Sequence, residues 1–114
     1  MIRSQQNKRR PSHPSVEGEW DSNSNPVISW DTVEEATNYK ILKWLLGNSN
    51  YDTISVGNVL SFTDVSVDNG GNTGSWCYEM VAEDIPDGND LAISNTVIFD
   101  SQTGDITYDD SGFQ

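Results

Sequence analysis

Nucleophilic and metal chemistry have few side chains available in this sequence. Its 114 residues include one cysteine, Cys77, and one histidine, His13. A serine or cysteine nucleophile needs a base beside it, and His13 lies in the basic N-terminal stretch, outside the segment expected to fold. No cationic residue near Cys77 in the sequence would favour its thiolate, so we expect a packing residue. A single cysteine also excludes an internal disulfide and a cysteine metal cluster.

Carboxylates are the one abundant reactive group, with 18 Asp and Glu residues. On so acidic a chain carboxylate pairs arise by chance, and a glycosidase needs a cleft that a sandwich of this size rarely forms. The loops at residues 68–72 and 84–90 offer oxygen ligands for Ca²⁺, but neither has EF-hand spacing, and turn chemistry explains their composition. We therefore predict no enzymatic activity, no cofactor and no metal site.

The charge is divided unevenly along the chain. Basic residues cluster in the first ten positions, at Arg3, Lys8, Arg9 and Arg10, whereas every acidic residue lies after residue 16 and the net charge is -12. A body this acidic repels nucleic-acid phosphates and anionic membranes, so we expect neither nucleic-acid binding nor membrane insertion. The basic cluster is the predicted partner-binding site, because it could form charge-assisted hydrogen bonds with carboxylates of other protein subunits.

The elements that would position these groups read as strands. Within residues 25–43, Ile28 and Trp30 share one face of a first strand, and Tyr39 and Ile41 share one face of a second. This period of two is what a half-buried sheet requires. Turn clusters rich in Gly, Asn and Asp separate further predicted strands at residues 16–20, 51–55, 60–67, 76–82 and 91–100. About seven short strands at this spacing indicate an all-β sandwich.

A helix is the competing interpretation for residues 32–47. Thr32 followed by Glu35 resembles a capping box, and Gly47 stands where a helix would end. Val33 and Ala36 begin a passable helical stripe. From the residues alone, the helix and the strand are about equally supported.

Five motifs in order resemble the pattern of fibronectin type III domains, over about residues 26–99. They are Ile28-Ser29-Trp30-Asp31, Ala36-Thr37-Asn38-Tyr39-Lys40-Ile41, Ser61-Phe62-Thr63-Asp64, Tyr78-Glu79-Met80-Val81-Ala82 and Ser94-Asn95-Thr96-Val97. The resemblance implies an immunoglobulin-like β-sandwich with a strand at residues 39–43. It also implies that Trp30 and Tyr39 pack in the core and that Tyr78 is the family's corner tyrosine.

The chain departs from the family pattern at its first strand, which is poorly marked, and in two loops. The usual Leu-x-Pro-Gly turn is replaced by residues 68–74, and no Arg-Gly-Asp occurs at 83–90. Integrin-type cell adhesion is therefore not implied.

We predict three parts: an extended basic N-terminal arm at 1–15, a fibronectin type III-like domain at 16–100, and an acidic C-terminal tail at 101–114. The arm has no apolar periodicity and should be flexible when alone. No apolar stretch follows its basic residues, as a secretory signal would require, and no run reaches the eighteen or more apolar residues of a membrane span. Within the tail, Ile106-Thr107-Tyr108 could form one more strand.

Two classes of function fit a domain of this kind, both without catalysis. The first is a structural protein of an assembly: a surface or decoration component of a virion (a phage capsid or tail), anchored by the N-terminal arm. The alternative is a glycan- or cell-surface-binding or spacer module of a secreted bacterial protein. Its candidate ligand-stacking residues are Trp20, Trp44 and Tyr51, because exposed aromatic faces stack on sugar rings, although the same residues could cap the core. A fragment of a larger secreted enzyme is disfavoured by Met1. The expected location is a virion surface or the extracellular space.

Overall fold

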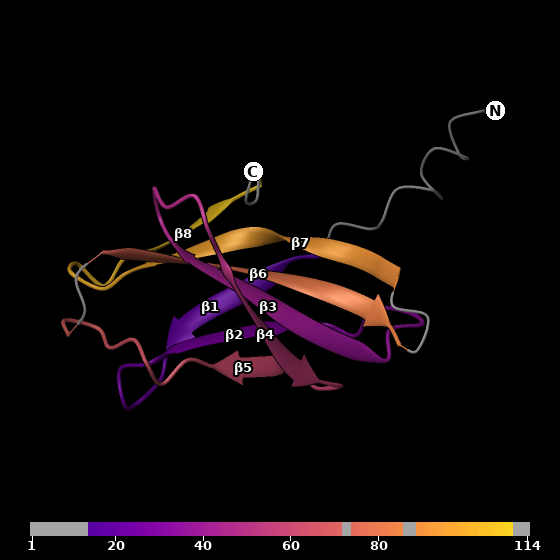
Figure 1. Ribbon diagram of the computed structural model, residues 1–114. Helices are drawn as coiled ribbons and strands as arrows, with labels where there is room; N and C mark the ends of the chain where they lie inside the picture. Colours follow the sequence, from indigo (N-terminus) through magenta and orange to yellow (C-terminus); the bar gives the residue numbers. More distant parts are fainter. Residues whose placement is uncertain (1–13, 72–73, 86–88, 111–114) are drawn as a thin grey trace.

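A computed structural model describes residues 14–71, 74–85 and 89–110, and none of these residues lies in a helix. Eight strands form two packed sheets (Figure 1). They are β1 (Val16–Trp20), β2 (Pro26–Trp30), β3 (Asn38–Leu45), β4 (Asp52–Gly57), β5 (Ser61–Thr63), β6 (Ser75–Asp84), β7 (Asn89–Asp100) and β8 (Ile106–Asp109). The predicted all-β sandwich is confirmed.

The strand order in one sheet is β1-β2-β5, and in the other it is β4-β3-β6-β7-β8. Every neighbouring pair is antiparallel. The first seven strands therefore distribute as in an immunoglobulin-like sandwich. The eighth, β8, lies in the segment where one further strand was considered, and it pairs with β7 from Thr96↔Asp109 to Phe99↔Ile106.

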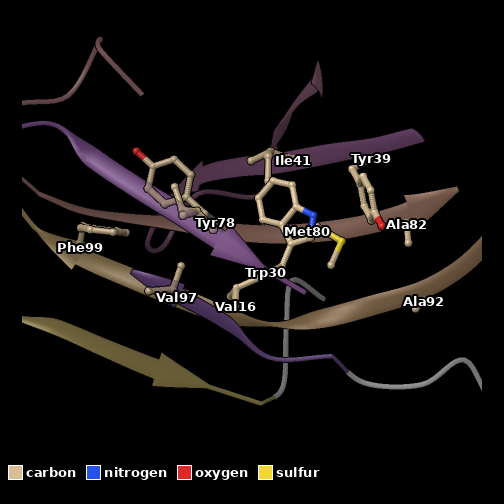
Figure 2. Close-up of a cluster of buried hydrophobic side chains, with 11 residues drawn as sticks. Val16, Trp30, Tyr39, Ile41, Tyr78, Met80, Ala82, Ala92, Val97 and Phe99 are labelled. Atoms are coloured by element: carbon tan, nitrogen blue, oxygen red, sulfur yellow. The ribbon is translucent and has the colours of Figure 1, made fainter. Parts of the chain in front are cut away.

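The core lies between the sheets, where the inward faces of β2 and β3 meet. Ile28 and Ile41 are fully buried, and Trp30 and Tyr39 expose 5% and 1% of their surface, as the alternation predicted. Figure 2 shows the Trp30 indole in the middle of the buried cluster, with Tyr39 on one side of it and Tyr78 on the other. The rings of Trp30 and Tyr39 lie 5.6 Å apart, a separation at which aromatic pairs add about 0.5–1.5 kcal/mol beyond their buried area.

The helical interpretation of residues 32–47 is wrong. The amide of Ala36 donates to the carbonyl of Val33 at 3.0 Å, and Glu35 has a φ of 72°. These two features close a tight turn, after which β3 begins at Asn38. Because β3 pairs with β4 and β6 on its two sides, long-range pairing outweighs local helix propensity here.

The strand predicted at 60–67 is shorter than expected. It ends at Thr63, and Asp64 begins a turn in which the Val67 amide donates to the Asp64 carbonyl at 3.4 Å. In a continuous strand Val65 and Val67 would share one face. Instead Val65 is 76% exposed and Val67 is 1% exposed, because a turn does not alternate as a strand does.

Candidate functional site

The predicted partner-binding residues Arg3, Lys8, Arg9 and Arg10 lie outside the described residues. The structure does describe the two remaining lysines, Lys40 and Lys43. The sequence has no other Lys, Arg or His after residue 13. Each of them is held by carboxylates of the sandwich itself. The surface charge of the sandwich is therefore set by its acidic residues.

Lys40 is paired on the outer face of the five-stranded sheet. Its Nζ lies 3.0 Å from Oε2 of Glu83 and 3.6 Å from Oδ1 of Asp90. The hydrogen bond to Glu83 raises the pKa of Lys40 despite partial burial. Burial alone would raise the pKa of Glu83, but hydrogen bonds from Asn38 and Lys40 outweigh it and lower the pKa. The pair is partly exposed, so its contribution to stability is small.

Lys43 belongs to a buried polar network that joins the two sheets. Its Nζ lies 2.6 Å from Oδ2 of Asp64, which also accepts a 2.7 Å hydrogen bond from the Tyr78 hydroxyl. The other carboxylate oxygen accepts from the hydroxyl and the amide of Ser66, at 2.6 and 3.0 Å. Asp64 follows β5 of one sheet, whereas Lys43 and Tyr78 come from β3 and β6 of the other.

The electrostatics of this network favour a charged Asp64 and a protonated Tyr78. Burial alone would raise the pKa of Asp64, but the ion pair with Lys43 and the hydrogen bonds from Ser66 and Tyr78 outweigh burial and lower it. Burial raises the pKa of Tyr78, and the neighbouring Asp64 carboxylate raises it further. Tyr78 is fully buried, and its hydroxyl donates to the side chain of Asp64 in the turn after β5, whereas a corner tyrosine bonds a backbone group a few residues upstream.

A shallow cavity of about 250 Å³ lies at the end of the sandwich where β3 turns into β4. Its lining residues come from β3, from the hairpin loop, from the start of β4 and from β6: Lys43, Trp44, Leu45, Asn48, Asn50, Asp52 and Trp76. The Nζ of Lys43 lies 4.9 Å from the centroid of the Trp76 ring. The buried indole N–H of Trp76 has no hydrogen-bond partner among the described residues. The cavity therefore combines aromatic surface with amide and carboxylate groups.

The three aromatic residues proposed for ligand stacking lie in different environments. The ring of Trp20 packs edge-on against Phe99 at 5.1 Å, and its N–H donates to the Gly104 carbonyl at 3.0 Å. Trp44 was expected to offer an exposed ring for stacking, but only 7% of its surface is accessible. Tyr51 is 46% exposed on the hairpin loop. Only Trp44 of these three lines the cavity.

Sequence reasoning missed two residues of this end of the sandwich, Lys43 and Trp76. Lys43 has the same strand parity as Tyr39 and Ile41, so alternation places it on the inward face of β3. A lysine there requires a buried carboxylate partner. That parity was the available signal for the Asp64 network.

Cys77 was expected to be a packing residue, and it is 1% exposed. Burial raises the pKa of its thiol to about 11, with a further contribution from Asp109. The thiol is therefore protonated and unreactive at neutral pH.

The two loops considered for Ca²⁺ are only partly described, since residues 72 and 86–88 fall outside the described ranges. In the first loop, Oδ1 of Asp68 accepts a 2.7 Å hydrogen bond from Asn25, and the Asn69 amide donates to the Ser24 carbonyl. These bonds tie the loop to the turn between β1 and β2. Across residues 14–71, 74–85 and 89–110, no three His, Cys, Asp or Glu side chains gather as a metal site would require. Nor do those ranges hold a helix with the length and apolar character needed to span a membrane.

Comparisons with known proteins give likeness in structure alone. No family model and no curated protein matches the sequence. A fibronectin type III-like protein from Clostridium thermocellum superposes with a TM-score of 0.61 at 20% identity, over 77% of this chain and 90% of that one. A myokine superposes with a TM-score of 0.60 at 20% identity, over 79% of this chain and 96% of that one. The strand order and these two likenesses show that the chain has a fibronectin type III fold.

Proposed function

We propose that this chain is a non-enzymatic structural protein of a larger assembly, a surface or decoration component of a virion, anchored by its N-terminal arm. The fold is that of an interaction or structural module. The observation that carries the proposal is the internal pairing of Lys40 and Lys43 with carboxylates of the sandwich.

This pairing divides the molecule into two electrostatic parts. Residues 14–114 contain two lysines and 18 acidic residues, a net charge of 2 − 18 = −16, and the arm contributes +4 to give the total of -12. Since both lysines of the sandwich are already engaged, the arm carries the basic side chains available to a partner. An acidic neighbouring subunit would attract the arm and repel the sandwich, so that the sandwich faces outward.

The test is incorporation into particles. The full chain, a chain lacking residues 1–13, and the variant R3K/R9K/R10K would each be produced in the host during particle assembly, and their amounts in purified particles measured. Deletion should abolish incorporation, whereas the lysine variant, which keeps every charge, should retain most of it. Incorporation of the truncated chain at the full-length level would contradict the proposal.

A second candidate function is glycan binding in the cavity at the β3–β4 turn. The specific observation is that Trp44 and Trp76 line this cavity together with Asn48, Asn50 and Asp52. The amide and carboxylate groups of these last three residues could bond neighbouring sugar hydroxyls. The Trp44 ring is too enclosed to offer a broad stacking face, so recognition would depend mainly on hydrogen bonds.

A glycan array with the intact protein would test this second function. Binding should be lost in N50A/D52A and kept in N58A, a change in the loop after β4, outside the cavity lining. A protein that binds no glycan, or whose binding survives N50A/D52A, would exclude the cavity as a glycan site.

A further inference from the structure

The two sheets have four edge strands: β1 and β5 in the smaller sheet, β4 and β8 in the larger. An edge strand presents unpaired backbone groups to other strands unless it is short, charged or otherwise protected. Three of these edges have such protection. β1 carries the exposed Glu17 and Glu19, and β5 has only three residues. β8 has four residues, ends in Asp109 and is followed by Asp110.

β4 is the least protected edge. Its six residues, DTISVG, contain no Lys, Arg, Glu or Pro, and its only charge is Asp52 at its first position. Ile54 and Val56 pack against the core, while Thr53 and Ser55 are exposed on the outer face. A strand added beside β4 would therefore continue both the apolar inner face and the hydroxyl-bearing outer face of the sheet.

We infer that β4 pairs antiparallel with β4 of a second copy of this chain, joining the two five-stranded sheets into one. The charge distribution favours a second copy at this edge. β4 itself contributes a single carboxylate, Asp52 at its first position, so pairing two copies along this strand brings few like charges together.

We place the two-fold axis of the pair at Ile54, in the regular part of the β4 ladder. β4 pairs regularly with β3 from Asp52 to Ser55, and a bulge at Val56 interrupts the ladder. Residues directly opposite in an antiparallel pair lie on the same face. A two-fold axis at Ile54 satisfies this condition and keeps the regular stretch in the pair. It places Ile54 opposite its counterpart, Thr53 opposite the partner's Ser55, and no carboxylate opposite another.

The dimer should be weak and should respond to salt in a characteristic direction. One strand pair buries less than the roughly 1,200 Å² of a stable interface. Two copies with a net charge of -12 each repel one another, and this repulsion is screened as the Debye length falls from about 10 Å in 0.1 M salt to about 3 Å in 1 M salt. Association through β4 should therefore strengthen with salt. Association through the basic arm would instead weaken with salt. The dimer and the proposed function can therefore each fail without the other.

Sedimentation equilibrium of the full chain, over a concentration series in low and high NaCl, tests the inference. The full chain should show a monomer–dimer equilibrium that shifts toward dimer in high salt. The variant T53K/S55K should dimerise about tenfold more weakly, because lysines then lie opposite lysines across the pair. The matched variant T53K/S55E should dimerise at least as well as the unmodified chain, because each lysine then faces a carboxylate.

These variants separate strand pairing from a general effect of charge. T53K/S55K lowers the net negative charge, so general repulsion alone would make it associate more strongly. Both positions are exposed, and an unchanged unfolding temperature would show that each variant is folded. A protein that stays monomeric in high salt at every concentration would overturn the inference. A dimer that weakens with salt, or one that T53K/S55K does not weaken, would overturn it as well.

Discussion

Asp64 links the two sheets through several polar contacts. Its carboxylate forms an ion pair with Lys43 and accepts a hydrogen bond from Tyr78, both from the five-stranded sheet. Its backbone amide donates to the Pro26 carbonyl of the three-stranded sheet at 2.9 Å. A buried charge is tolerated only when it is paired and hydrogen-bonded. Each partner of Asp64 is therefore expected to matter more than an ordinary surface contact.

Tyr78→Phe should lower the free energy of unfolding by about 1.5–3 kcal/mol, the range for hydrogen bonds to charged groups. The change removes only the hydroxyl that donates to Asp64. Urea unfolding at neutral pH measures the loss. Val65→Ala, at the 76% exposed neighbour of Asp64, should change stability by less than about 0.5 kcal/mol. Equal effects of the two substitutions would contradict the assigned role of the hydroxyl.

The same network predicts how stability depends on pH. The folded-state pKa of Asp64 is lowered, so its contribution is complete above the unfolded value of about 3.9 and is lost as pH falls below it. The folded-state pKa of Tyr78 is raised, so its contribution is complete below about pH 10 and is lost as pH rises further. Urea unfolding across this range should show a plateau with a loss at each end.

Asp64→Asn provides the control for the acid limb. It should be less stable at neutral pH and should lose less additional stability in acid than the unmodified chain. Glu83 and Asp100, whose pKa values are also lowered, would supply the remaining acid dependence. If Asp64→Asn lost as much stability between neutral and acid pH as the unmodified chain, Asp64 would not be a source of the acid dependence.

At the scale of the elements, β1 is held against the other sheet by close approach at Gly18. A Cβ added at Gly18 would lie 2.7 Å from Cζ of Phe99 and 2.8 Å from Cγ2 of Val97. Its amide also donates to the Tyr108 hydroxyl of β8 at 3.1 Å. Glycine is therefore required here for packing between the sheets.

Gly18→Ala should destabilise the protein by about 1–3 kcal/mol, the usual cost of forcing an extra carbon into a packed core. Chemical unfolding with tryptophan fluorescence would measure the change, since Trp20 lies on the same strand. Glu17→Ala, at the exposed neighbouring position, should stay within about 0.5 kcal/mol of the unmodified chain. A neutral Gly18→Ala would show that β1 can move away from β7.

The sequence predicts an element well when its local residue pattern determines it, and poorly when partners distant in the chain do. The inward pairs Ile28 and Trp30, and Tyr39 and Ile41, alternate strictly, and the strands they belong to were predicted correctly. The turn after Asp64 contains Val65 and Val67, whose spacing imitates a strand. Hydrogen bonds from Ser66 to the Asp64 side chain and from the Val67 amide to the Asp64 carbonyl hold this turn. Local sequence also could not choose between helix and strand near Thr32, because the partners of β3 are distant in the chain.

The candidate site was less predictable than the fold for the same reason. The cavity at the β3–β4 turn unites Trp76 of β6 with Asn48 and Asp52, which no spacing in the sequence brings together. Trp44 was recognised as aromatic, but its burial depends on neighbouring strands. The charge division, in contrast, is a property of composition and was visible at once.

At the scale of the whole molecule, the net charge of -12 should make stability depend on salt. Repulsion among surface carboxylates opposes the compact state, and screening weakens this repulsion as the Debye length falls from about 10 Å in 0.1 M salt to about 3 Å in 1 M salt. The thermal unfolding midpoint should therefore rise with NaCl. E34Q/E35Q, which removes two exposed charges from one loop, should show a smaller rise. A midpoint that falls with NaCl would mean that ion pairs outweigh repulsion.

The reversal of the chain at β8 has a mechanical consequence. Successive strands run back and forth between the two ends of the sandwich, so β7 finishes at the end opposite the start of β1, and β8 then runs back along β7 (Figure 1). A load applied through a chain leaving directly from β7 would shear the whole sandwich. A load applied through β8 instead falls first on its four paired residues, one after another from Asp109. We expect β8 to detach from β7 at low force, while the remaining strands stay folded.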